Sequence, residues 1–387
     1  MSRSLLLVYA ALLAWGVGEG MFILFVPLYL QDLGAEPVAI GSVLGLFGLM
    51  MMLMHVPAGY LADRLGRRPL LVLGWGIGAL SAAVMALAAA LPLFVVGFLV
   101  YGLTAFISAP LFSYVTAERG SLSAGRVMTF GSAMFAVGAV IGPPAGGWIG
   151  EAFGLRMTFA IAAGIFVLSS ALILFIRAQP REAPVPEAVR TNVLANPAYV
   201  RLLVVLFVAS FAMFLAQPLT PNFLQNERQI PLQVMGWIGG AGSIGNVVFN
   251  LVLGRGRPRG NFILGQAFVV LFVLLVWLGT SAPWYALGYF VLGGFRVARM
   301  LGFAQVRALI HDAQMGLAYG ITEAVNALAM VLAPLLAGFL YDGMPASMYP
   351  VALAVLAFSI TLSALLAPRE IHDASPQPAV VVSDGIG

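Results

Sequence analysis

Apolar runs long enough to cross a lipid bilayer recur twelve times and restrict what this chain can fold into. The hydrocarbon core of a bilayer, about 30 Å thick, takes roughly 20 residues of helix to cross. Inside lipid, the backbone N–H and C=O groups can all be hydrogen-bonded only in helices or closed barrels. The chain is 61% hydrophobic and 9% charged over 387 residues, too apolar for a soluble domain. We therefore predict an all-α membrane protein. Its twelve transmembrane helices are expected at 5–30, 38–62, 70–90, 92–116, 127–150, 155–177, 199–224, 232–254, 261–281, 284–308, 314–341 and 349–367.

The remaining composition excludes several classes of function. The net charge is +4, and all nineteen basic residues are arginines that lie mostly in loops on one side, so no nucleic-acid partner is predicted. Cysteine is absent, which excludes disulfides and thiolate metal sites. The three histidines are scattered along the chain. No metal site and no cofactor is expected.

The arginines predict the orientation of the chain in the membrane. With the N-terminus in the cytoplasm, fifteen of the nineteen fall on the cytoplasmic side, and only Arg156 and Arg228 fall outside. Arg296 and Arg299 lie within a span. An excess of basic residues marks cytoplasmic loops. We expect a multi-pass protein of a bacterial inner (plasma) membrane with both termini in the cytoplasm.

The sequence repeats itself in two halves. Residues 25–31 (FVPLYLQ) are echoed by residues 219–225 (LTPNFLQ), and the glycine-proline pattern of 138–147 has a softened copy at 329–338. Two halves of six spans each predict two pseudo-symmetric six-helix bundles around a central site. The predicted parts are an N-terminal bundle (1–177), a cytoplasmic linker (178–198), a C-terminal bundle (199–367) and a disordered cytoplasmic tail (368–387).

Two motifs stand out in the first half. Residues 59–69, between the second and third spans, read GYLADRLGRRP and place an acid and three arginines at the membrane edge. The fifth span carries small residues and prolines that let a neighbouring helix approach closely. The members of the fifth-span motif are Gly138, Gly142, Pro143, Gly146 and Gly147.

Both motifs resemble signatures of the major facilitator superfamily of transporters. The loop matches G-x-L-A-D-R-x-G-R-[RK], with Arg68 where lysine is common, and the fifth-span pattern is similar to that of the twelve-helix drug:proton antiporter branch. The second half departs from the pattern, because alanines replace glycines and loop 255–259 lacks the acid. The resemblance implies alternating access, a cavity lined by helices 1, 4, 7 and 10, a fifth helix packed on the other half, and a monomer.

The loop motif has two interpretations. In the first, its charges set the topology and do nothing more. In the second, Asp63 and Arg64 make contacts between the halves that hold the cytoplasmic side closed. A contact that breaks and reforms is a bistable element of the kind that alternating access requires. The residues assigned to this cytoplasmic gate motif are Gly59, Asp63, Arg64, Gly66, Arg67 and Arg68.

Ionisable residues deep in spans are costly and mark function. Glu19, near the middle of helix 1, is a candidate proton carrier because an apolar setting favours the neutral form of a carboxyl. A structural hydrogen-bond partner is the alternative. Arg296 and Arg299 share one face of helix 10. At about 1.5 Å per residue, Arg299 and Glu323 both lie roughly 13–15 Å from the cytoplasmic end. Glu323 is thus either a second proton-coupling candidate or the partner of a structural salt bridge.

Polar residues of the cavity-lining helices complete the set of candidates. An unpaired cavity arginine would attract a carboxylate or phosphate on a substrate. Each smaller polar residue can equally bridge two helices. The substrate-binding candidates are Arg296, Arg299, Tyr101, Thr104, Ser108, Gln217 and Asn222.

These residues favour a secondary active transporter, with lipid, a small-molecule substrate and protons as its partners. Its predicted activity is proton-coupled efflux of small amphipathic or drug-like molecules. The alternative is an organic-anion carrier that works by uptake, exchange or uniport and uses the helix 10 arginines. A non-transporting scaffold or receptor is a third class. An enzyme is not expected, because no nucleophile–base pair and no phosphate-binding loop is present in the sequence.

Overall fold

The computed structural model describes residues 2–179, 193–253, 258–295, 305–306, 309–310 and 315–367, with only the backbone given for 55–65 and for a few helix ends. The first half contains α1 (Arg3–Phe22), α2 (Val26–Asp32), α3 (Pro37–Leu65), α4 (Arg67–Leu87), α5 (Leu91–Gly102), α6 (Ser108–Ala117), α7 (Ala124–Phe153) and α8 (Leu155–Leu174). The second half contains α9 (Pro197–Leu215), α10 (Thr220–Asn226), α11 (Leu232–Leu253), α12 (Pro258–Leu278), α13 (Ala282–Leu292), α15 (Met315–Gly343) and α16 (Met348–Leu366).

Each predicted span contains a described helix, so the all-helical membrane fold is confirmed. Ten segments of the described chain are long and apolar enough to cross a membrane. The other two predicted spans correspond to α11 and to the segment that begins with α13, of which eleven helical residues are described. Large apolar side chains such as Leu80 and Leu365 are 62% and 75% exposed, which suits contact with lipid.

In the part of the chain that the structure describes, helices 1, 4 and 7 are divided where a continuous span was expected. Helix 1 divides at the 3₁₀ turn η1 (Ile23–Phe25) before Pro27, and helix 4 at η2 (Leu103–Ile107) before Pro110. Helix 7 divides between α9 and α10 before Pro221. In each case proline lacks the backbone N–H that would continue the helix. The breaks in helices 1 and 7 lie at equivalent positions of the repeat.

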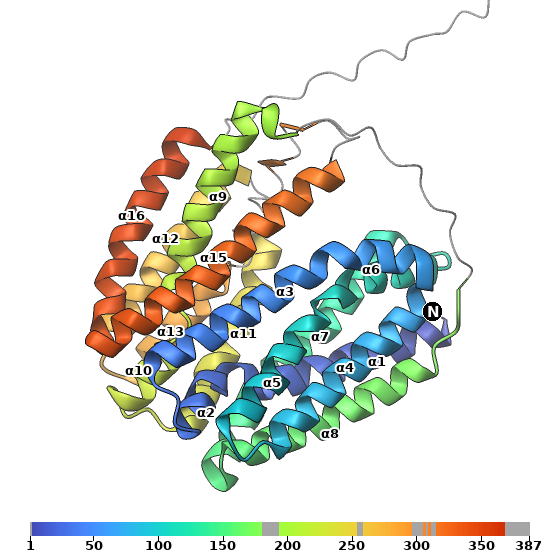
Figure 1. Cartoon of the computed structure of the whole chain (residues 1–387), viewed down its shortest axis with the longest axis horizontal. Coiled ribbons are helices and arrows are strands. Elements are labelled where there is room, and N and C mark those ends of the chain that lie inside the picture. Colours follow the sequence, from blue (N-terminus) through green and yellow to red (C-terminus); the bar gives the residue numbers. More distant parts are fainter. Residues whose placement is uncertain are drawn as a thin grey trace, which may run out of the picture.

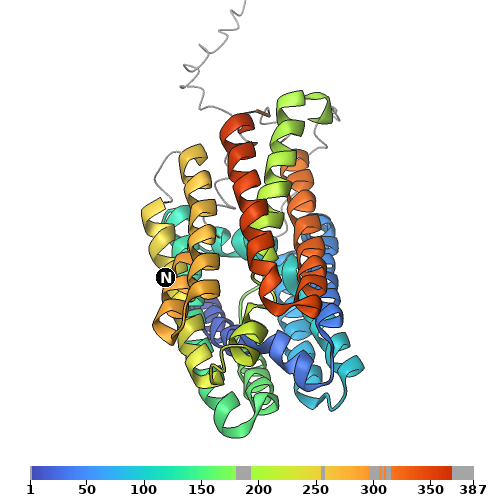
Figure 2. The same ribbon diagram turned by 90° about the vertical axis from the view of Figure 1, so that its left-hand side faces the viewer.

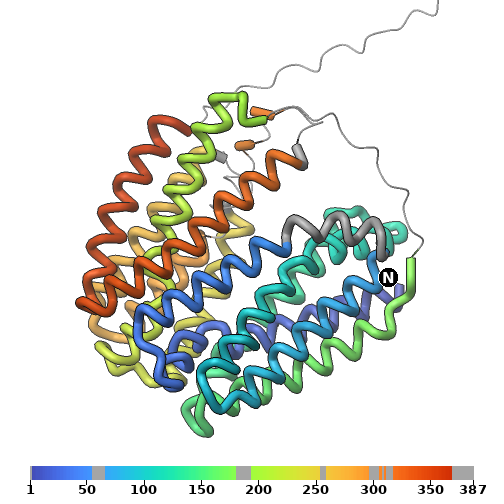
Figure 3. The backbone as a smooth tube through the Cα atoms, in the orientation of Figure 1, coloured from blue at the N-terminus to red at the C-terminus, as the bar shows by residue number. Residues whose placement is uncertain are grey.

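The helices form two bundles that lie side by side (Figures 1 and 2). In the first bundle α1 packs between α7 and α8, and α4 packs on α5 and α8. In the second bundle α9 packs on α15 and α16, and α12 packs on α13 and α16. The colours of the backbone tube run from blue to green through the first bundle and on to red through the second (Figure 3). The two halves of the sequence are therefore the two halves of the fold.

Among the described residues, the bundles meet mainly where α3 packs on α15, α7 on α11, and α2 on α10. We call the end with the loops at 33–36, 88–90 and 227–231 the outer end, because the arginine pattern predicts it to face away from the cytoplasm. The opposite end is the inner end. Close backbone contacts between the bundles run from Pro37 to Gly48 on α3 and from Leu232 to Gly240 on α11. Both stretches belong to the outer parts of their helices.

Candidate functional site

The candidate site is centred on Glu19, near the middle of the span Arg3–Asp32. Its two glycine neighbours sit against other helices. A Cβ on Gly18 would lie 2.9 Å from the ring of Phe166, and a Cβ on Gly20 would lie 3.0 Å from Pro143. Close packing on these two sides places helix 1 within the first bundle, with the half-buried Glu19 side chain beside helix 4.

One oxygen of the Glu19 carboxylate accepts two hydrogen bonds. The indole Nε1–H of Trp15 donates to Oε2 at 3.0 Å, and the hydroxyl of Tyr101 donates to the same atom at 2.9 Å. Trp15 lies four residues before Glu19 and therefore on the same face of α1. An indole N–H can only donate, so Glu19 Oε2 is the acceptor of the hydrogen bond from Trp15.

Aromatic rings hold both donors in place. The rings of Trp15 and Tyr101 are stacked at 6.1 Å, and Phe166 meets Trp15 edge-on at 4.5 Å. Phe22 meets Tyr101 edge-on at 5.3 Å, and Phe47 stacks on Tyr101 at 6.4 Å. These rings come from α1, α3, α5 and α8, so four helices fix the two hydrogen-bond donors.

Three of the other candidates bond to carbonyls of their own helices. Thr104 donates to the carbonyl of Tyr101 at 2.7 Å, and the exposed Ser108 donates to that of Ala105 at 3.1 Å. Gln217 donates to the carbonyl of Met213 at 2.5 Å. All three sit at the breaks in helices 4 and 7, where helical hydrogen bonding is interrupted. Tyr101, by contrast, donates to Glu19 itself.

The remaining candidates are Asn222, Glu323, Arg296 and Arg299. Asn222 lies at the outer end, fully buried, where its amide donates to Gln31 on helix 1. Glu323 is half-buried on α15. Arg296 and Arg299 lie outside the described residues, and so does their predicted pairing with Glu323.

The fifth-span motif packs α7 on both neighbours. A Cβ on Gly138, Gly142 or Gly146 would overlap backbone atoms of α1. Gly147 faces the other bundle, where a Cβ would overlap the carbonyl of Leu232, and Pro143 contacts α11 as well. Three glycines of the motif therefore join helices 1 and 5, and its last glycine joins the two bundles.

The loop motif makes its described contacts inside the first bundle. Gly66 turns the chain between α3 and α4 with φ +83°, a conformation that side chains disfavour. Arg67 donates to Gln179 at 3.1 Å, and Arg68 donates to the carbonyl of Leu174 at 2.9 Å. The backbone at Gly59, Asp63 and Arg64 is helical, and their side chains lie outside the described residues.

Comparisons with known proteins decide the family. The model of the Major Facilitator Superfamily matches residues 8–293 and 202–382. The chain belongs to this superfamily of transporters. It is 22% identical to the quinolone resistance protein NorA of Staphylococcus aureus, over 88% of this chain and 91% of that protein. It is 28% identical to multidrug resistance protein 2 of Bacillus subtilis over 161 residues, 41% of this chain and 40% of that protein. The crystal structure of the nucleoside transporter NupG superposes with a TM-score of 0.76 at 17% identity, over 95% of this chain and 98% of that one.

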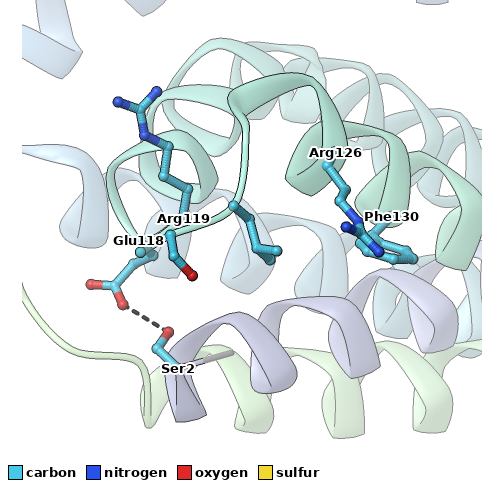
Figure 4. A pocket seen from close by; sticks show the side chains of 8 residues that line it. Ser2, Glu118, Arg119, Arg126 and Phe130 are labelled. Carbon is cyan, nitrogen blue, oxygen red and sulfur yellow. Dashed lines mark hydrogen bonds between the residues drawn. The ribbon is translucent and has the colours of Figure 1, made fainter.

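A surface pocket of this transporter lies at its inner end, away from Glu19 (Figure 4). It has a volume of about 440 Å³ and lies between the start of α1 and the loop that joins α6 to α7. Ser2 donates to Glu118 at 2.8 Å, and the guanidinium of Arg126 lies over the ring of Phe130 at 5.8 Å. Ser2 and Glu19 are about 25 Å apart along the helix at ~1.5 Å per residue.

Several polar residues of this transporter were not among the predicted site residues. Trp15 could have been found, because it precedes Glu19 by one helical turn. Gln31 was noted only as part of the repeat. Its partner is Asn226. The carboxylate of Glu151 accepts a hydrogen bond from Leu232 N at 2.8 Å. Both residues lie at the ends of spans, where polar residues are common and do not by themselves indicate a site.

Proposed function

We propose that this member of the superfamily is a proton-coupled exporter of small amphipathic or drug-like molecules. The observation that carries the proposal is the Glu19 carboxylate in mid-span, with Trp15 and Tyr101 donating to one of its oxygens. A charged side chain at this depth is costly unless it is paired or used. Glu19 is the proposed proton carrier.

The geometry suits a group that gains and loses a proton. The two donors hold the Glu19 carboxylate in place, and the aromatic rings around them hold the donors. A change in the protonation of Glu19 would therefore alter its charge more than its position. Binding a proton removes the negative charge, and a cationic or polar substrate group can then no longer be held by it. Proton and substrate would in this way exclude each other, as antiport requires.

The names of the relatives support the substrate class. NorA is a quinolone resistance protein, and the Bacillus relative is a multidrug resistance protein. Resistance of this kind fits export of drug-like molecules. The remaining assignments of the sequence analysis belong to the same proposal. They are the cytoplasmic position of both termini, the limits of the bundles and linker, a monomeric state, and a cytoplasmic gate at Asp63 and Arg64.

The experiment is substrate-driven proton movement in proteoliposomes. The purified protein is reconstituted with a trapped pH dye, and norfloxacin, a fluorescent quinolone, is the probe. Antiport predicts proton flux opposite to norfloxacin flux and norfloxacin accumulation driven by an imposed pH gradient. Glu19→Gln is expected to lower both fluxes by about tenfold or more, because a glutamine side chain does not take up a proton.

Glu36→Gln is the matched control. Glu36 is an exposed carboxylate at the outer end of the same bundle, and its replacement should leave coupling intact. Norfloxacin transport without any proton flux would contradict the proposal. Transport of carboxyfluorescein that is abolished by Arg296→Ala or Arg299→Ala would instead support the organic-anion carrier, whose basis is the pair of arginines in the predicted tenth span.

A further inference from the structure

A cluster of side-chain amides joins the two bundles at the outer end. Gln31 at the end of helix 1 and Asn226 at the end of helix 7 form a reciprocal pair. The Gln31 amide N–H donates to Asn226 Oδ1 at 3.1 Å, and the Asn226 amide N–H donates to Gln31 Oε1 at 3.0 Å. Two hydrogen bonds of opposite direction therefore connect one bundle to the other.

Asn222 adds a third connection one helical turn earlier. Its amide donates to Gln31 Oε1 at 2.7 Å and to the backbone carbonyl of Pro27 at 3.2 Å. The hydroxyl of Tyr341 on α15 accepts from the Asn226 amide at 3.2 Å. The oxygen atom Oδ1 of Asn222 is buried without a hydrogen-bond partner. The cluster is thus strongly connected across the bundles but incompletely satisfied.

The surrounding backbone shows that the cluster lies in the closed part of the interface. A Cβ on Gly41 would overlap the carbonyl of Pro334, and a Cβ on Gly147 would overlap that of Leu232. At the same end Glu151 of the first bundle accepts from the Leu232 amide of the second at 2.8 Å. The outer end cannot open without separating Gln31 from Asn222 and Asn226.

We propose that Gln31, Asn222 and Asn226 form a latch that holds the outer end closed and is broken once in every transport cycle. We call this set the amide latch. It rests on the proposed transport function, because only a protein that exposes its site to both sides has to open there. The unpartnered Oδ1 of Asn222 limits the stability of the closed form, so the latch can open.

The latch is electrically neutral, and this has a functional consequence. Amides do not titrate, so the hydrogen bonds of the latch are themselves independent of the external pH and depend little on salt. Glu151, which accepts from Leu232 N, is a titratable group that joins the bundles at the same end. Proton coupling then remains the task of Glu19. The latch is also asymmetric. The repeat places Gln225 opposite Gln31, and Gln225 takes no part in the amide hydrogen bonds given for the latch.

The test uses a pulsed dipolar distance measurement across the outer end. The chain contains no cysteine, so Ala89→Cys and Ser281→Cys provide one spin label in an outer loop of each bundle. In nanodiscs the latch predicts a dominant short distance. Gln31→Ala and Asn226→Ala should each raise the ratio of long to short distances by about three- to tenfold, as expected for losing neutral hydrogen bonds.

Gln31→Glu provides a sharper test, because glutamate has nearly the same shape and is expected to fold. An ionised carboxylate cannot donate to Asn226 Oδ1. The long-distance population of this variant should therefore rise with pH through the usual titration range of glutamate, near about 4.3, and more steeply than in the latch-intact protein, where Glu151 is the carboxylate that joins the bundles. Gln225→Glu, the same change at the repeat-equivalent position, is the control and should leave the distances unchanged.

Unchanged distances in Gln31→Ala, Asn226→Ala and Gln31→Glu, with normal elution on size exclusion, would overturn the latch. A pH-dependent distance in the latch-intact protein that persists in Glu151→Gln would overturn its neutrality. The measurement needs neither substrate nor proton flux. Failure of proton-coupled transport with an intact latch would therefore count against the proposed function alone.

Discussion

The proposed proton coupling depends on one side chain, that of Glu19. A carboxylate in the middle of a span needs partners, and Trp15 and Tyr101 provide two from the face of helix 1 and from helix 4. Hydrogen bonds to a charged group contribute about 1.5–3 kcal/mol each. Two of them account for how the chain keeps an ionisable group where lipid would otherwise make it costly.

Tyr101→Phe removes one donor and keeps the ring. A hydrogen bond to a charged group contributes about 1.5–3 kcal/mol, so the variant loses part of the restraint on the Glu19 carboxylate. Transport of norfloxacin should then fall several-fold, as read from the concentration profile of proteoliposome flux. Tyr289→Phe, at a buried tyrosine of the second bundle that packs on Phe272, should keep the wild-type profile. Equal profiles for the Tyr101→Phe variant and the wild type would remove Tyr101 from the site.

Residue types alone could predict Glu19 and Tyr101 as candidates, because both are polar and lie in spans predicted to line a cavity. Their contact could not be predicted, since it depends on the rotation of helix 4 about its axis. The contacts of Asn222 could not be predicted either, because they depend on the rotation of helix 7 about its axis. The prediction named it a substrate residue, and the structure places it among the amides at the outer end, away from Glu19.

At the scale of elements, helix 5 is the most informative part of the structure. Small residues allow helices in lipid to approach closely, where van der Waals packing replaces the hydrophobic drive. The sequence predicts this packing from the spacing of the glycines. It does not say which glycine faces which neighbour, and the structure assigns Gly138, Gly142 and Gly146 to helix 1 and Gly147 to the second bundle.

Gly146→Val should destabilise the first bundle, because its side chain would overlap backbone of Met21. Overpacking of this kind typically costs about 1–3 kcal/mol. The expected result is a lower melting temperature in detergent, measured by intrinsic fluorescence. Gly164→Ala is the control, since a Cβ there meets nothing within 4 Å. An unchanged melting temperature for the Gly146→Val variant would show that helices 1 and 5 are not as close as described.

Gly147→Val tests the other face of α7, which packs on the second bundle. Here the clash is with Leu232 and Gly236 of the other bundle. We expect the outer end to open, seen as a larger long-distance population between labels at positions 89 and 281. A distribution like that of the latch-intact protein would mean that α7 and α11 do not restrain the outer end.

At the scale of the whole molecule, the fold follows from the hydropathy pattern and the repeat. The breaks in helices 1, 4 and 7 were missed, because a hydropathy window does not register a lost hydrogen bond at Pro27, Pro110 or Pro221. The conformational state of the structure could not be predicted from the sequence either. One sequence has to encode outward-closed and outward-open forms, and the contacts between the bundles at the outer end belong to the closed form.

The predicted orientation can be tested with single introduced cysteines, because the chain has none of its own. In intact cells a membrane-impermeant maleimide should label Ala89→Cys, in an outer loop. It should label Ser121→Cys, in the loop after α6, only after permeabilisation. The opposite pattern would reverse the assignment of the outer and inner ends.

The central claim, that Glu19 carries the exchanged proton, is tested most directly by proton release from the purified protein. In weakly buffered detergent solution with a pH indicator dye, addition of norfloxacin should release protons from the wild-type protein. The Glu19→Gln variant lacks the charge that holds a cationic group, so it should bind the drug more weakly, as followed by drug fluorescence. At drug concentrations that saturate the variant it should release no protons. Equal proton release from the Glu19→Gln variant, or drug binding without proton release in the wild type, would contradict the account.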